Sequence, residues 1–142
     1  MWGKVKRAVI NYFIVYVSMV GLAAVYFFVV SLGEPSPCAE CLEGFTITSF
    51  ITLLSALIFT VILYLYSLLR KEILDSKLLL VVCTLVSHFV YAYTYSILPD
   101  LFSNYNVNLD FIGFFILPAI VYTLSIWVLI KIKNLFAKLE FV

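Results

Sequence analysis

Charged residues are scarce in this chain, and they are absent from most of its length. Asp, Glu, Lys and Arg make up 12% of the 142 residues, whereas 65% are hydrophobic. The mean hydropathy is +1.14. A soluble domain carries roughly 25% charged residues, so this composition excludes an ordinary soluble domain. A net charge of +1 also gives no reason to expect a nucleic-acid partner.

Four long stretches contain no charged residue at all. Each has at least the roughly 20 residues that a helix needs to cross a hydrocarbon core of ~30 Å. None shows the strict alternation of a barrel strand, so helices are favoured. We predict an all-α fold, an integral membrane four-helix bundle that forms one domain over residues 1–142. The expected spans are approximately 8–33, 44–69, 78–99 and 111–131.

All nine basic residues are expected on one side of this bundle: Lys4, Lys6, Arg7, Arg70, Lys71, Lys77, Lys131, Lys133 and Lys138. The segments 34–43 and 100–110 contain no Lys or Arg. The positive-inside rule then predicts cytoplasmic N and C termini and two acidic loops outside the cell, in a multi-pass plasma-membrane protein. The first apolar run is too long for a signal peptide and no A-x-A-like site follows it, so we expect it to be retained.

Cysteine and histidine are also scarce, with three cysteines and one histidine in the chain. Two of the cysteines form the sequence Cys38-Ala39-Glu40-Cys41 in the first outer loop. This spacing closes a small disulfide ring or supplies half of a zinc site. The chain has no second Cys pair, and His88 lies inside the third span, so we expect no metal. The oxidising outer compartment favours redox use of the pair, and a structural disulfide is the alternative.

The position of the pair also bears on its chemistry. Pro35 and Pro37 disfavour helix, so the second helix is expected to begin close to Cys41. A helix N-terminus favours a thiolate at that position, whereas the neighbouring carboxylates Glu40 and Glu43 oppose it. The third cysteine, Cys83, falls in the middle of the third span. We expect it to be a small buried apolar residue.

Further polar and small residues lie in the third and fourth spans. The sequence Tyr91-Ala92-Tyr93-Thr94-Tyr95 ends the third span and is typical of an aromatic belt at a membrane interface. A ligand pocket that uses these rings is the alternative. In the fourth span, Gly113 and Pro118 predict close packing and a kink.

Several of these motifs occur together in one known family. The chain resembles the DsbB/BdbC disulfide-bond formation proteins in its Pro37-Cys38-Ala39-Glu40-Cys41 motif at the outer start of helix 2. His88 in helix 3 is similar to a histidine of that family, and Gly113-Phe114-Phe115-Ile116-Leu117-Pro118 resembles its opening of helix 4. Length and four-span topology agree as well. The resemblance implies a membrane enzyme that oxidises a thioredoxin-like partner and passes the electrons to a quinone.

Two features of the family pattern are missing. The segment 99–110 carries no cysteine, whereas the family has a second Cys pair there. Leu42-Glu43-Gly44-Phe45 follows the cysteines where the family tends to place an Arg. Electrons therefore cannot pass between two disulfides within this chain. Either a soluble thioredoxin-fold protein on the outer face meets Cys38–Cys41 directly, or another membrane subunit supplies the missing pair, or the enzyme activity has been lost.

The resemblance also implies a role for each matching residue. Cys38 would receive the attack of the partner thiolate, and Cys41 would face the quinone and reduce it. His88 would donate a hydrogen bond to a quinone carbonyl, and its alternative is a histidine satisfied by Ser87 or by a helix carbonyl. Phe45 and Tyr91 complete the expected quinone site.

Two other functions stay open at this point. The first is a non-catalytic membrane subunit or scaffold that keeps the disulfide as a local link. The second is delivery of a soft ion such as Cu(I) by Cys38 and Cys41, which ranks last because the outer segments are not rich in Met or His.

Overall fold

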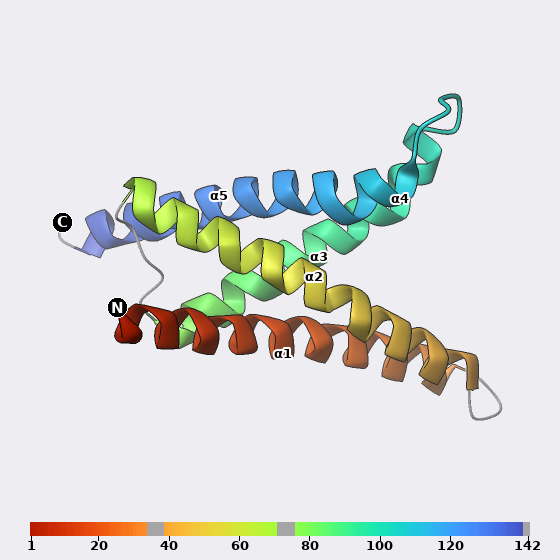
Figure 1. The fold of residues 1–142 in the computed structure, drawn as a ribbon, viewed down its shortest axis with the longest axis horizontal. Coiled ribbons are helices and arrows are strands. Elements are labelled where there is room, and N and C mark those ends of the chain that lie inside the picture. Colours follow the sequence, from red (N-terminus) through yellow and green to blue (C-terminus); the bar gives the residue numbers. More distant parts are fainter. Residues whose placement is uncertain (34–38, 71–75, 141–142) are drawn as a thin grey trace.

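The computed structural model describes residues 1–33, 39–70 and 76–140, and within them the chain forms helices and no strand. The elements are α1 (Trp2–Leu32), α2 (Ala39–Arg70), α3 (Lys77–Leu101), α4 (Leu109–Phe111), η1 (Ile112–Ile116) and α5 (Leu117–Glu140). The last three form one continuous helix, Leu109–Glu140. The predicted all-α class with four long helices is confirmed (Figure 1).

All four long helices are long and apolar enough to cross a membrane. The shortest, α3, has 25 residues and the longest have 32. Three of them extend beyond both ends of their charge-free stretch, so the charged residues that flank each stretch also belong to the helix. The helices therefore carry their charges at their ends and keep their middles apolar.

Each helix packs on two neighbours. α1 packs on α2 and α3, and α5 packs on the same two helices. Figure 1 shows α2 and α3 crossing between α1 and α5. The N-terminus and the ends of α2 and α5 lie at one end of the bundle, and the start of α2 and the α3–α4 connection lie at the other.

The core lies where the helices cross. Met19 of α1, Phe59 of α2, Cys83 of α3 and Ile126 of α5 are all buried there. Phe59 meets the ring of Tyr122 edge to face, with the ring centroids 5.3 Å apart. This contact joins α2 to α5 at the centre of the bundle.

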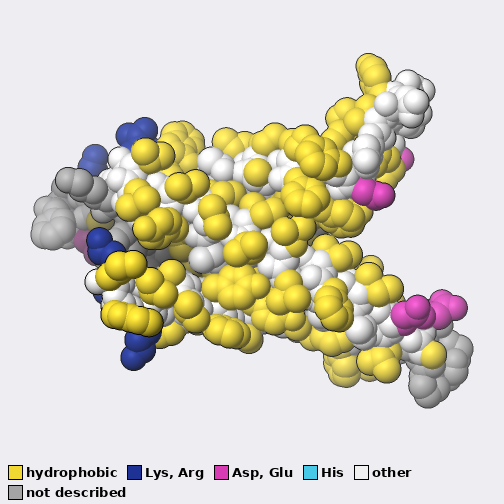
Figure 2. Space-filling model, in the orientation of Figure 1, with side chains coloured by type: hydrophobic (Ala, Val, Ile, Leu, Met, Phe, Trp, Pro, Cys, Tyr) yellow, Lys and Arg dark blue, Asp and Glu magenta, His cyan; other side chains and the backbone are white. Residues whose placement is uncertain are grey.

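Charge and shape both differ between the two ends. Figure 2 shows Lys and Arg side chains at one end and Asp and Glu side chains at the tips of the other. At the acidic end the α1–α2 pair and the α3–α4 pair diverge, and the surface is hollowed between them (Figures 1 and 2). We call this hollow the wedge. It gives the acidic end an opening between its two arms.

Hydrogen bonds fix α1 on its neighbours. The hydroxyl of Tyr12 donates to the carbonyl of Leu53, and the Lys77 ammonium donates to the Asn11 side chain at 2.8 Å. The side chain of Ser76 accepts from the Leu79 amide and caps the start of α3. These contacts set the position of α1 along α2 and of α3 at the basic end.

We predict that Phe59→Ala lowers the free energy of unfolding by about 2–3 kcal/mol, because the lost packing leaves a cavity. Phe50→Ala is the matched control, since Phe50 is 70% exposed whereas Phe59 is fully buried. Unfolding by SDS titration of the purified protein measures both. Equal losses in the two variants would contradict the described core.

Candidate functional site

Cys41 lies in the first turn of α2, at the acidic end of the bundle. Glu40 precedes it in the same turn. Cys41 is not a free thiol in the structure. Cys38 lies outside the described residues, so the pairing of the two cysteines stays a prediction.

An apolar hollow of about 280 Å³ lies beside Cys41, between α1 and α2. Its lining includes Phe27 and Phe28 of α1 together with Leu42 and Phe45 of α2. The rings of Phe27 and Phe45 meet edge to face, with centroids 6.2 Å apart. The volume is near the lower end of the range for small-molecule sites, roughly 300 Å³. The structure therefore brings together two of the predicted site residues, Cys41 and Phe45.

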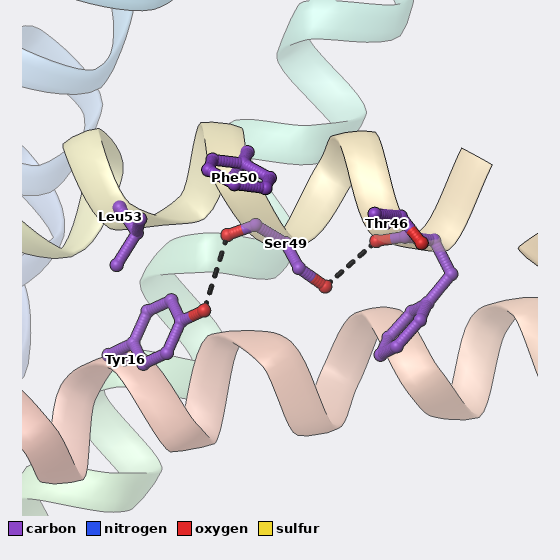
Figure 3. Close-up of a pocket in the computed structure, with 6 residues that line it drawn as sticks. Tyr16, Thr46, Ser49, Phe50 and Leu53 are labelled. Carbon is purple, nitrogen blue, oxygen red and sulfur yellow. Dashed lines mark hydrogen bonds between the residues drawn. The ribbon is translucent and has the colours of Figure 1, made fainter. Parts of the chain in front are cut away.

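A second hollow, of about 260 Å³, lies one turn further along α2 (Figure 3). Phe45 lines it too, with Tyr16, Ser49 and Phe50 among its neighbours. Its hydroxyl groups are already used: Tyr16 donates to the Ser49 carbonyl and Ser49 donates to the Phe45 carbonyl. This hollow offers a ligand an apolar wall with few free polar groups.

His88 is buried in the bundle, where it meets Tyr122 of α5. The His88 Nδ1 and the Tyr122 hydroxyl are 2.9 Å apart. Tyr122 is fully buried and its ring also contacts Tyr91, at a centroid distance of 5.5 Å. Ser55 of α2 lies beside the hydroxyls of both tyrosines. His88, Tyr91, Tyr122 and Ser55 thus form a polar cluster from three helices, which we call the central cluster.

The hydroxyl of Tyr91 has its own acceptor. It donates to the carbonyl of Gly113 at 2.9 Å. Gly113 lies in the π-helical turn η1, where the Leu117 amide bonds to the Ile112 carbonyl instead of to Gly113. The next residue, Pro118, has no amide hydrogen. The Gly113 carbonyl is therefore left without a donor from the following helical turn, and Tyr91 supplies one.

Close packing accompanies this bond. A Cβ atom on Gly113 would overlap the ring of Tyr95, because α3 and η1 approach each other at this residue. Tyr95 also stacks on Phe114, with centroids 5.7 Å apart. Tyr91 is thus buried, and Tyr95 packs one face on η1 while it stays 37% exposed, whereas Tyr93 is 66% exposed. The predicted aromatic belt divides into rings that hold η1 and a ring that faces outward.

The sequence raised the alternative that Ser87 forms a hydrogen bond with His88, and the structure does not show this bond. Ser87 does not satisfy His88, because its Oγ is the buried side-chain atom that lacks a hydrogen-bond partner among the described residues. Neighbouring side chains on a helix point about 100° apart, so Ser87 faces away from the imidazole. Cys83 is free and buried, in line with the expectation of a small apolar residue.

The predicted site residues form two groups. Cys41 and Phe45 lie in the hollow between α1 and α2, and His88 and Tyr91 lie in the central cluster. Within the described residues, no ring contact or hydrogen bond joins Phe45 to His88 or Tyr91. A single compact quinone site is therefore not assembled by direct contact among these side chains.

Sequence reasoning missed Tyr122. Its signal was weak, since a tyrosine four residues after Pro118 in an apolar span is also typical of core packing. A usable hint was that His88 needed a polar partner inside the bundle, and few other residues of the fourth span could supply one.

Comparison with known proteins adds no relative. No protein-family model, curated protein or solved structure matches the chain. The resemblance to the DsbB/BdbC family therefore rests on the residues themselves.

We predict that Gly113→Ala destabilises the protein by about 1–3 kcal/mol, because the added methyl group overpacks against Tyr95. Gly21→Ala is the control, since a Cβ there meets no atom within 4 Å. Ala favours helix over Gly by up to about 1 kcal/mol, so this control should be neutral or stabilising. SDS titration compares the two variants, and a stable Gly113→Ala protein would contradict the close approach of α3 and η1.

Removing only the Tyr91 hydroxyl should have a smaller effect. We predict that Tyr91→Phe costs about 1–2 kcal/mol, because the Gly113 carbonyl loses its donor inside the bundle. Tyr93→Phe is the control, because Tyr93 is exposed. If the two variants unfold at the same SDS concentration, the Gly113 carbonyl does not depend on Tyr91.

Proposed function

We propose that this protein is a multi-pass membrane thiol–disulfide oxidoreductase that passes electrons from a thioredoxin-like partner through Cys38 and Cys41 to a quinone. The observation that carries this proposal is the position of Cys41. It lies in the first turn of α2, at the acidic end, beside an apolar aromatic hollow. A sulfur at this position is accessible both to a partner and to a carrier dissolved in lipid.

The charge distribution supports the orientation. Lys and Arg occupy one end of the bundle and Asp and Glu the tips of the other (Figure 2). By the positive-inside rule the basic end with both termini faces the cytoplasm. The cysteines then face the outer compartment, where disulfides persist.

The reaction starts with oxidation of the partner. A partner thiolate attacks Cys38, the Cys38–Cys41 bond breaks, and Cys41 leaves as a thiolate. The second partner thiol then attacks the mixed disulfide and releases Cys38. The partner has lost two electrons and two protons, and Cys38 and Cys41 have gained them as two thiols.

Re-forming the Cys38–Cys41 bond releases those two electrons and two protons. The hollow beside Cys41 would hold a quinone, which would accept these electrons and protons as the quinol. Phe27, Phe28 and Phe45 beside Cys41 fit a planar apolar ring. The hydroxyl of Ser31 at this hollow already donates to the Phe28 carbonyl. Hydrogen bonds to a quinone carbonyl in this hollow would therefore come from first-turn amides of α2, which have no acceptor within their own helix.

The partner must meet this pair without a second disulfide in the chain. The segment between α3 and α4 contains no cysteine. Direct attack on Cys38 is the simpler arrangement, and the wedge opens at the end of the bundle where α2 begins (Figure 2). A second membrane subunit that supplies a Cys pair is the other arrangement.

We predict that the reduced protein reoxidises when duroquinone is added, with loss of two thiols per chain. Cys41→Ser should lower this rate to the uncatalysed background, because no disulfide can form with Cys38. Cys83→Ser is the matched control and should keep the rate, since Cys83 is buried away from the hollow. Thiol titration over time measures all three proteins.

A wild-type protein that ignores quinone, or a Cys41→Ser variant that reoxidises at the wild-type rate, would contradict the proposal. Absence of a quinone response together with stable co-purification of a larger membrane partner would support the scaffold instead. Stoichiometric copper in the reduced protein would support metal delivery.

A further inference from the structure

The second nitrogen of His88 is not completely enclosed by the protein. His88 Nδ1 is engaged by Tyr122, whereas Nε2 forms no hydrogen bond within the described residues. In the described part of the chain, only the Ser87 hydroxyl oxygen is both fully enclosed and without a hydrogen-bond partner. Nε2 also lacks a partner, so it is not fully enclosed. The residual 8% exposure of His88 therefore includes its free ring edge.

The tautomer of His88 follows from the needs of Tyr122. The Tyr122 hydroxyl is buried in an apolar bundle, and a buried O–H group without an acceptor is unfavourable. Its hydrogen-bond partner is His88 Nδ1, at 2.9 Å. No other acceptor for the phenol hydrogen lies within hydrogen-bond distance among the described residues, so this hydrogen points at Nδ1. A nitrogen that accepts carries no hydrogen, so the hydrogen of the neutral ring sits on Nε2.

We propose that Tyr122 is a positioning residue, whose hydroxyl holds His88 in the tautomer with hydrogen on Nε2 and leaves this N–H as a free donor. The geometry that carries the proposal is the Tyr122–His88 bond on one ring edge and the exposed Nε2 on the other. The ring cannot rotate freely, because it is packed against Tyr91 at 5.7 Å as well as against Tyr122.

The ligand for this donor is a carbonyl oxygen of a lipid-soluble molecule. That part rests on the proposed function, which makes the ligand a quinone. A free N–H donor in apolar surroundings is strongly selective for an acceptor, since most lipid tails offer none. Tyr122 itself does not touch the ligand in this arrangement and acts through His88.

The experiment uses the fact that His88 is the only histidine in the chain. Ring ¹⁵N-histidine labelling of the full-length protein in lipid nanodiscs gives one Nδ1 and one Nε2 signal. The neutral wild-type protein should show an N–H signal for Nε2 and a hydrogen-free signal for Nδ1. Hydrogen on Nδ1 instead would overturn the proposal without any variant.

Tyr122→Phe removes the hydroxyl and keeps the ring that packs on Phe59. Its ¹⁵N signals should shift toward the averaged positions of a mixture of both tautomers. Tyr91→Phe is the matched control, because it also loses a buried hydroxyl beside His88, but one that bonds to Gly113. Its two signals should stay at the wild-type positions. Identical spectra for Tyr122→Phe and the wild type would overturn the role of Tyr122.

Adding duroquinone to the Cys38→Ser/Cys41→Ser protein tests the ligand separately from the redox reaction. The Nε2 signal should shift while the Nδ1 signal changes little, and an unmoved Nε2 signal would overturn the ligand-facing role. In the same doubly substituted background, adding Tyr122→Phe should raise the duroquinone concentration that gives half of this shift by roughly 2- to 10-fold, the worth of one hydrogen bond. An unchanged half-saturating concentration would contradict the positioning role. If the tautomer is as proposed but no quinone-dependent reoxidation occurs, the proposed function fails and the tautomer assignment stands.

Discussion

An apolar helix bundle must satisfy its polar groups within the protein, because lipid or a dry core offers no hydrogen bonds in exchange. Most serine and threonine hydroxyls in the described residues meet that constraint locally. Thr60, Thr84 and Thr123, for example, each donate to the carbonyl four residues earlier in the same helix. Such bonds use the one hydrogen of each hydroxyl, so these groups have no hydrogen left to donate to a ligand. The polar groups that depart from this local pattern are the ones that define the sites of the molecule.

Two departures from the regular pattern lie close together. The π-helical turn η1 and Pro118 free the Gly113 carbonyl, and Tyr91 of α3 meets it. His88, one helical turn before Tyr91, bonds to Tyr122 of α5 rather than to its own helix. Both bonds link α3 to the continuous helix Leu109–Glu140. The same pair of helices forms one arm of the wedge, so the central cluster holds the base of that arm in place.

The fold was predictable from the sequence because its signal is the absence of charge. Four charge-free stretches define four helices, and the charged ends define which ends lie together, whatever the side-chain details. The exact helix ends were less predictable. Glu40 and Lys133, for example, lie in helices although they fall outside the charge-free stretches. A charged residue at a helix end is compatible with helical backbone, so the loss of charge-free sequence does not mark the end of a helix.

The candidate site was predictable only in part. The neighbourhood of Cys41 and Phe45 follows from four-residue spacing along one helix, which sequence shows directly. The partners of His88 and Tyr91 come from other helices, and which faces meet depends on crossing geometry that no local pattern encodes. The π-helical turn is of the same kind. Gly113 and Pro118 predicted an irregularity there, but not which carbonyl it would free.

The central claim is that the cysteine-bearing acidic end faces outward and that its sulfurs are within reach of a soluble partner. A membrane-impermeant maleimide tests it most directly, applied to the reduced Cys83→Ser protein in sealed right-side-out and inside-out vesicles. The account predicts labelling in right-side-out vesicles and protection in inside-out vesicles until the membrane is dissolved. Labelling confined to inside-out vesicles, or none before dissolution in either orientation, would contradict it.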